Sequence, residues 1–135
     1  MSVVVDASVI LKWVLDEPGQ AEAEALLDQE LTAPALWLVE AANALWRRVI
    51  RGELLAEEAQ ERLAELGNAP VRTSAIADDL MVAVRLAIRL RHPVYDCLYL
   101  AAALREGTHV VTADVRFFEA VAARNEFSGS VRILA

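Results

Sequence analysis

The segment Val3-Val4-Val5-Asp6-Ala7-Ser8 places three β-branched residues directly before an acid and two small residues. β-Branched residues favour strands, and a short unbroken apolar run is typical of a strand buried on both faces. The segment therefore predicts a buried strand that ends at Asp6 and is followed at once by a helix. Strands buried on both faces are characteristic of parallel sheets, so an α/β fold is indicated.

Short apolar strands and helices alternate along the rest of the chain. Strands are expected at Val3–Val5, Leu31–Ala33, Val71–Thr73, His109–Thr112 and Val131–Ile133. Helices are expected at Ala7–Leu15, Gln20–Glu30, Leu36–Arg51, Leu55–Leu66, Ala75–Arg91, Val94–Glu106 and Asp114–Arg124. Because no hairpin signal such as Asn-Gly occurs, the pattern predicts a three-layer α/β/α fold with a central, mainly parallel sheet flanked by helices. No linker or repeat is found, and residues 1–135 are expected to form a single domain.

Two of the expected helices carry clear apolar patterns. In the helix over 75–91, Ile76, Leu80, Val84 and Ile88 recur near helical spacing and are expected to face the core. In the helix over 20–30, the same role is expected for Ala21, Ala25 and Leu26.

Composition excludes several classes of protein. Thirteen basic against 20 acidic residues give a net charge of −7, which argues against a protein that coats nucleic acid non-specifically. The single Cys97 and the two histidines, His92 and His109, exclude a disulfide framework and a zinc site built on several thiolates. Both histidines are expected not to be ligands. No basic leader precedes Asp6 and no stretch of about 20 apolar residues occurs, so a cytoplasmic protein without a membrane segment is expected.

The five glycines are isolated in the sequence, and neither of the glycine-rich phosphate-binding motifs GxGxxG and GxxxxGK[ST] can be written. Nucleotide binding of the Rossmann or P-loop type is therefore set aside.

Four carboxylates occupy positions that are unusual for charged residues. Asp6 and Asp114 each follow a predicted strand, where either could also serve as the N-cap of the next helix. Glu40 has Leu36, Trp37, Asn43 and Ala44 as its helical neighbours, and Asp96 begins the apolar helix over 94–106. The alternatives are a partly exposed helix edge for Glu40 and a favourable first-turn charge for Asp96.

Taken together, these acids indicate a metal site. All four can converge at one edge of a parallel sheet, where crowded carboxylates raise one another's pKa unless a cation neutralises them. Oxygen ligands without His or Cys suit Mg²⁺ or Mn²⁺. Such ions bridge carboxylates to substrate phosphates, so the residues by themselves predict a metal-dependent phosphodiesterase or phosphatase.

The motifs around these acids resemble those of PIN-domain ribonucleases, in particular the VapC toxins of toxin–antitoxin pairs. The resemblance covers nearly the whole chain and rests on Asp6-Ala7-Ser8 with Lys12-Trp13, Glu40 with Asn43-Ala44-Leu45 and Arg51-Gly52, Tyr95-Asp96 with Tyr99-Leu100-Ala101, and Thr112-Ala113-Asp114 with Arg116-Phe117. No single motif is diagnostic, but four in this order and spacing make a specific signal.

The resemblance implies roles for individual residues. Asp6, Glu40, Asp96 and Asp114 would be the catalytic, metal-binding acids, with Asp6 and Asp96 as the first candidates for direct ligands and Glu40 and Asp114 acting directly or through water. Ser8, Asn43 and Thr112 would support the acids, and Lys12 and Arg116 would contact RNA phosphates.

The implied reaction is Mg²⁺- or Mn²⁺-dependent hydrolysis of RNA phosphodiester bonds, by a toxin that arrests growth by cutting tRNA, rRNA or mRNA. The implied partners are an RNA substrate, a cognate VapB-type antitoxin and a second copy of the chain in a homodimer. Two alternatives stay open: a non-catalytic PIN-like module that binds RNA or protein, and a metal-dependent phosphatase. A haloacid-dehalogenase-type phosphatase would need Asp-x-Asp where this chain has Asp6-Ala7-Ser8.

Overall fold

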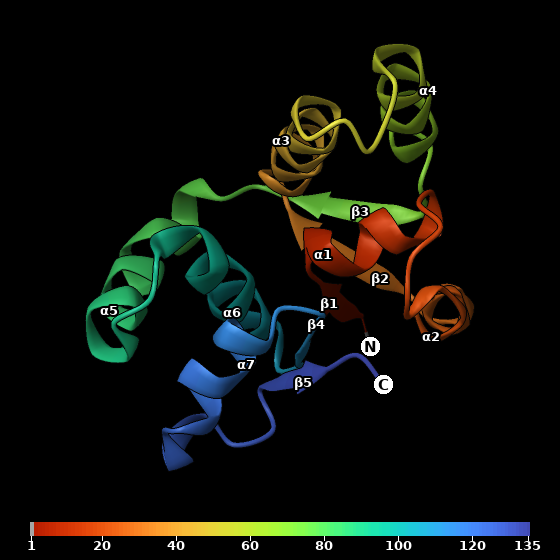
Figure 1. The fold of residues 1–135 in the computed structure, drawn as a ribbon. Helices are drawn as coiled ribbons and strands as arrows, with labels where there is room; N and C mark the ends of the chain where they lie inside the picture. Colours follow the sequence, from red (N-terminus) through yellow and green to blue (C-terminus); the bar gives the residue numbers. More distant parts are fainter. Residues whose placement is uncertain (1) are drawn as a thin grey trace.

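The computed structural model describes residues 2–135 and contains five strands and seven α-helices within them (Figure 1). The strands are β1 (Val3–Val5), β2 (Leu31–Pro34), β3 (Val71–Ser74), β4 (Val110–Thr112) and β5 (Val131–Ile133). The helices are α1 (Ala7–Ile10), α2 (Gln20–Ala25), α3 (Trp37–Ile50), α4 (Ala56–Leu66), α5 (Leu80–Leu90), α6 (Val94–Glu106) and α7 (Val115–Ala122). Short 3₁₀ turns cover Leu11–Trp13, Leu26–Asp28, Ala77–Asp79 and Asn125–Phe127.

The sheet has the strand order β3-β2-β1-β4-β5, and every neighbouring pair is parallel. β1 lies at the centre, and all three of its residues are buried. The predicted α/β/α class with a central parallel sheet is confirmed. From β1 the chain moves outward to β2 and β3, and it then crosses back to β4 and β5. β1 and β4 are therefore the neighbouring strands at which the winding direction reverses.

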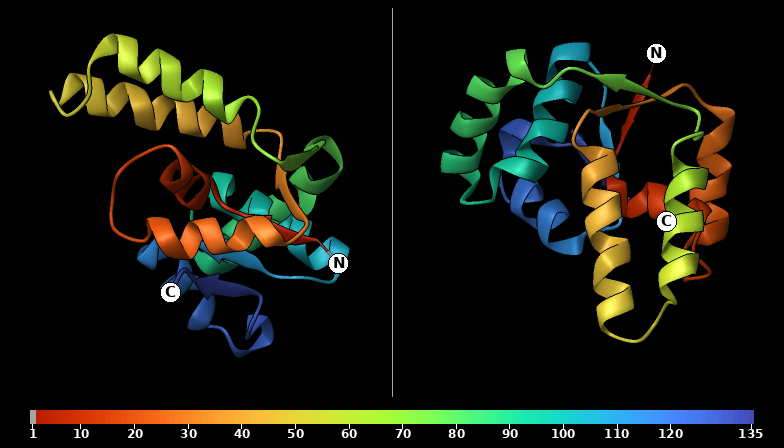
Figure 2. Two further views of the ribbon diagram at one scale, coloured as in Figure 1. Left: turned by 90° about the vertical axis from the view of Figure 1, so that its right-hand side faces the viewer. Right: turned by 90° about the horizontal axis from the view of Figure 1, so that it is seen from above.

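Helices cover both faces of the sheet, with α1 and α2 on one side and α6 and α7 on the other (Figure 1). α5 packs outside α6, and α3 and α4 form a hairpin that stands beyond the edge strand β3 (Figure 2). α6 is the central helix, since every residue from Cys97 to Ala103 is buried. A helix that is apolar on all sides packs in the core. Asp96 lies in the first turn of this helix.

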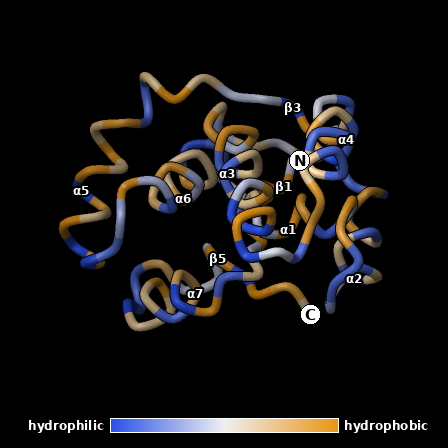
Figure 3. The backbone as a smooth tube through the Cα atoms, turned by 45° about the horizontal axis from the view of Figure 1, so that its top comes forward, coloured by the Kyte–Doolittle hydropathy of each residue, from blue (hydrophilic) through white to orange (hydrophobic). Residues whose placement is uncertain are grey.

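The inner faces expected for two helices were only partly correct: Ile76 and Leu26 are half-buried and pack against the core, whereas the other residues of the two sets are exposed. The regular helix α5 begins at Leu80, and it buries Ala83, Leu86 and Leu90 instead of the expected stripe. Leu80, Val84 and Ile88 are exposed by 42%, 41% and 74%. Both faces of α5 are apolar, so spacing alone could not decide which one meets α6. Figure 3 shows this apolar helix at the periphery of the molecule.

In α2 the buried residue is Ala23, whereas the expected Ala21 and Ala25 are exposed and Leu26 is half-buried. α2 is short and continues as a 3₁₀ turn from Leu26. Within residues 2–135, no helix combines the length and the apolar character needed to span a bilayer.

Candidate active site

The reversal between β1 and β4 places Asp6 and Asp114 side by side at the carboxyl edge of the sheet. Asp6 continues directly from β1, and its amide donates to the carbonyl of Val111 in β4 at 3.0 Å. Asp114 begins α7 two residues after β4 ends. In parallel α/β sheets, ligands bind in the crevice at such a reversal point, beyond the carboxyl ends of the strands.

Asp6 is a buried carboxylate held by two hydroxyl groups. Its side chain does not cap α1, which excludes the N-cap alternative, and the residue is only 5% exposed. Thr112 Oγ1 donates to Asp6 Oδ2 at 2.6 Å, and Ser8 Oγ donates to the same oxygen at 2.9 Å. Both hydrogen bonds go to one oxygen, which leaves Oδ1 for another ligand.

The same two hydroxyl groups tie Asp6 to the start of α7. Ser8 Oγ accepts from the amide of Ala113 at 3.0 Å, and Thr112 Oγ1 accepts from the amide of Asp114 at 3.0 Å. Asp114 does act as an N-cap, because its Oδ1 accepts from the amides of Arg116 and Phe117 at 3.0 and 3.3 Å. The cap fixes the Asp114 side chain through one oxygen.

Glu40 reaches the site from the first turn of α3, and a tyrosine holds it. The hydroxyl of Tyr99, on α6, donates to Glu40 Oε1 at 2.6 Å. Sequence reasoning quoted Tyr99 only as part of a motif and gave it no role. The signal that could have found it is its position within the apolar helix expected over 94–106, because a buried tyrosine hydroxyl needs a hydrogen-bond partner.

Asp96, in the first turn of α6, pairs with His92, a histidine that was expected not to be a ligand and had no predicted supporting role. His92 Nε2 lies 2.5 Å from Asp96 Oδ2, and the imidazole stacks on the ring of Phe117 with centroids 5.3 Å apart. The α5–α6 turn sets this position: Arg91 has a φ of 53°, and the His92 amide donates to the Ala87 carbonyl at 3.1 Å. In the sequence, the only sign of this pair is the four-residue spacing between His92 and Asp96, and Pro93, which lies between them, breaks the helix that would bring them together.

The four carboxylates share one pattern of hydrogen bonding. In each, the protein holds one oxygen: Asp6 Oδ2, Glu40 Oε1, Asp96 Oδ2 and Asp114 Oδ1. No hydrogen bond within residues 2–135 reaches the second oxygen of any of them. Each acid is thus fixed in direction while keeping one oxygen available.

The acids also lie close enough to raise one another's pKa. Burial raises the pKa of Asp6 to about 6, with further increases from Asp96 and Asp114, against the lowering effect of Thr112 and Ser8. Burial likewise raises the pKa of Glu40 to about 7, and Asp6 and Asp96 add to the increase. Burial raises the pKa of Asp96 against the hydrogen bond from His92, and Asp114 adds to the increase.

A divalent cation would relieve this unfavourable charge, and the oxygen-only donor set suits a hard ion such as Mg²⁺ or Mn²⁺. Across residues 2–135, no group of three or more His, Cys, Asp or Glu side chains is already arranged to coordinate a metal ion. The fit to a cation rests on the available oxygens and the shared charge of the four acids.

The remaining predicted site residues lie differently. Asn43 is exposed, and its side chain makes no hydrogen bond to Glu40 in the described part of the chain. Lys12 is engaged elsewhere, since its Nζ donates to Glu17 at 3.1 Å and to the Pro18 carbonyl at 2.8 Å, and Glu17 also pairs with Arg48. Arg116 is exposed at the start of α7, beside Asp114.

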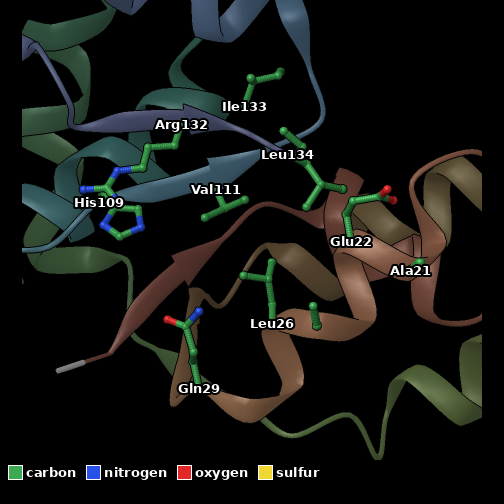
Figure 4. A pocket seen from close by; sticks show the side chains of 11 residues that line it. Ala21, Glu22, Leu26, Gln29, His109, Val111, Arg132, Ile133 and Leu134 are labelled. Carbon is green, nitrogen blue, oxygen red and sulfur yellow. The ribbon is translucent and has the colours of Figure 1, made fainter.

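A cavity of about 540 Å³ lies away from the acids, between α2 and the β4–β5 part of the sheet (Figure 4). Leu26, Val111 and Leu134 line it together with His109 and Arg132. None of the four acids contributes to its wall. The candidate active site is therefore the carboxyl edge of the sheet and not this cavity.

The chain is similar to known proteins in both sequence and fold. The family model described as PIN domain matches residues 3–123. The chain is 34% identical over 123 residues to Ribonuclease VapC3 of Pyrobaculum aerophilum, and the match covers 88% of this chain and 94% of that protein.

Solved structures with the same fold share less sequence. PAE2754 from Pyrobaculum aerophilum superposes with a TM-score of 0.74 at 20% identity, over 99% of this chain and 84% of that one. A toxin–antitoxin complex from Klebsiella pneumoniae gives 0.63 at 14% identity, over 96% and 95%. VapC20 from Mycobacterium tuberculosis, a toxin that cleaves the sarcin–ricin loop, gives 0.68 at 19% identity, over 87% and 94%.

These structural likenesses establish the fold, and the family model together with the VapC3 relative establishes the family. The chain belongs to the PIN-domain family, among the VapC ribonucleases.

Proposed function

We propose that this protein is an endoribonuclease toxin that cleaves RNA with the help of Mg²⁺ or Mn²⁺ held by Asp6, Glu40, Asp96 and Asp114. The observation that carries the proposal is the shared pattern of the four acids, each with one oxygen held by the protein and one available. The PIN-domain family uses a divalent metal, and the relative VapC3 is named a ribonuclease.

The chain's own residues prepare the site for this reaction. Ser8 and Thr112 hold Asp6 in one orientation, and the N-cap geometry does the same for Asp114. The raised pKa values of Asp6 and Glu40, about 6 and about 7, mean that these acids keep their protons to a higher pH than ordinary carboxyl groups until a cation favours their charged forms. A bound divalent ion would polarise the phosphodiester and lower the pKa of the attacking water.

RNA would approach this acidic edge with its charge offset by bound cations and by Arg116, which lies exposed beside Asp114. Lys12 is a weaker candidate for a phosphate contact because its ammonium is already paired. A VapB-type antitoxin is the proposed inhibitor. Support comes from the structural likeness to a toxin–antitoxin complex, together with membership of the VapC ribonucleases.

A homodimer is also proposed, and the unexpected exposure on α5 supports it. Met81 and Ile88 are exposed by 64% and 74%, next to the partly exposed Leu80 and Val84. Exposed apolar residues gathered on one helix are typical of an association surface. Light scattering coupled to size-exclusion chromatography should give a dimer for the wild type and a monomer for Ile88→Glu. A monomeric wild type at micromolar concentration would contradict this proposal.

The deciding experiment is RNA cleavage by the purified protein with Mn²⁺, with Mg²⁺ and with EDTA. Asp6→Asn and Asp96→Asn keep the shape of each side chain while removing its charge, and both should abolish cleavage. Asp16→Asn is the matched control, because Asp16 is exposed and makes no hydrogen bond through its side chain within the described residues. Cleavage that persists in EDTA, or in both acid variants, would refute the proposed mechanism.

A further inference from the structure

Tyr99 sits where three parts of the proposed site meet. It lies on α6 one turn after Asp96, and its hydroxyl donates to Glu40 Oε1 on α3. α6 also packs against β1, the strand that runs directly into Asp6. One side chain thus connects the segments that carry Glu40 and Asp96, on a helix that packs against the strand before Asp6.

The hydroxyl is not needed to fill space. Tyr99 is fully buried, and its neighbours Leu98 and Leu100 on α6 are apolar and buried as well. A phenylalanine would occupy nearly the same volume without placing a polar group in the core, where a hydroxyl is unfavourable unless it is hydrogen-bonded. The distance of 2.6 Å is typical of a charge-assisted bond between a hydroxyl and a carboxylate.

We propose that Tyr99 is a positioning residue that fixes Oε1 of Glu40 and so leaves Oε2 as the single oxygen that Glu40 offers to the divalent cation. The inference rests on the proposed metal-dependent function. Without the hydroxyl, the Glu40 carboxylate is free to rotate about its last torsion angle, and its available oxygen no longer has a fixed direction relative to Asp6 and Asp96. Partners that orient metal ligands contribute about 10- to 100-fold to metal affinity.

Tyr99→Phe tests this directly, and the same helix provides a matched control. Tyr95, the residue before Asp96 on α6, is 66% exposed and its hydroxyl makes no hydrogen bond within the described residues, so Tyr95→Phe removes a hydroxyl that holds none of the acids. Titration calorimetry with MnCl₂ alone, without RNA, should show affinity about tenfold weaker or more for Tyr99→Phe and unchanged for Tyr95→Phe. Thermal unfolding in EDTA confirms that each variant is folded.

Two further measurements separate positioning from a general structural effect. In a Glu40→Ala background, adding Tyr99→Phe should change Mn²⁺ affinity no further, because the group on which Tyr99 acts is gone. In RNA cleavage, Tyr99→Phe should lower kcat and leave KM for RNA unchanged, and excess Mn²⁺ should restore part of the lost rate.

The outcomes distinguish the two levels of the proposal. If the wild type binds Mn²⁺ and cuts RNA while Tyr99→Phe has the affinity of Tyr95→Phe, the role of Tyr99 is refuted and the proposed function stands. The role is also refuted if Tyr99→Phe weakens binding equally with and without Glu40. A wild type that neither binds Mn²⁺ nor cuts RNA refutes both.

Discussion

Replacing Asp6 with asparagine should abolish cleavage and, in the absence of metal, make the protein more stable. Asp6 is 5% exposed, and burial together with Asp96 and Asp114 raises its pKa from 3.8 to about 6. The folded state therefore holds the proton of Asp6 more tightly than the unfolded chain does. The asparagine side chain of the variant keeps an oxygen that can accept the hydrogen bonds from Ser8 and Thr112, so the charge is the main difference.

The sign and size of the effect follow from this difference in pKa. Between about pH 4 and pH 6 the folded state binds more protons than the unfolded state, so the free energy of unfolding falls as pH rises through this window. At about 1.36 kcal/mol for each pH unit, ionised Asp6 lowers the stability of the metal-free protein by about 3 kcal/mol above pH 6. Glu40, with its pKa raised to about 7, acts in the same direction up to about pH 7, with a smaller effect because it is partly exposed.

Urea unfolding followed by circular dichroism in EDTA measures the difference between Asp6→Asn and the wild type. We expect the variant to be about 3 kcal/mol more stable at pH 8 and the advantage to shrink to near zero by about pH 4. Saturating Mn²⁺ should then stabilise the wild type more than the variant, because only the wild type keeps the charged ligand. A variant that is no more stable than the wild type at pH 8, or an advantage independent of pH, would refute the reasoning.

Two further substitutions test the surroundings of the site, and a third tests a buried ion pair at the other end of α6. Thr112→Val removes a donor that lowers the pKa of Asp6, so the acidic limb of the pH–rate profile should move to higher pH and the rate should fall. His92→Ala removes the partner of Asp96 Oδ2 and should weaken Mn²⁺ binding about tenfold in calorimetry; unchanged affinity would show that the pair is not needed. Arg105→Ala deprives the buried Asp79 of two hydrogen bonds, at 2.9 and 3.0 Å, and should cost about 3 kcal/mol in urea unfolding while cleavage by the folded protein continues.

The sequence was most informative where local pattern and tertiary structure agree. The β-branched run of β1 and the apolar run before Asp114 predicted buried parallel strands, and both are central to the sheet. The positions of Asp6 and Asp114 were also readable, because a residue that follows a parallel strand must lie at its carboxyl edge.

The partners of the acids were harder to predict. His92 contacts Asp96 only because Arg91, in the α5–α6 turn, has a positive φ. Positive φ is uncommon for residues other than glycine, so an arginine at this position gives no sign of it in the sequence. Tyr99 meets Glu40 only once α3 and α6 are both placed, and Glu40 precedes it by 59 residues. The inner face of α5 was misassigned because a helix that is apolar on two sides carries no sequence signal for which side meets a neighbour within the chain.

The central position of β4 has a consequence for synthesis of the protein. Thr112, which holds Asp6, follows it by 106 residues, and β4 must pair with β1 before the hydrogen bond can form. A growing chain whose β4 segment has not yet emerged from the ribosome exposes Asp6 and Glu40 but lacks Thr112 and Asp114. Under the proposed function, a nascent toxin is therefore incomplete as a nuclease until its β4 segment has emerged and paired with β1.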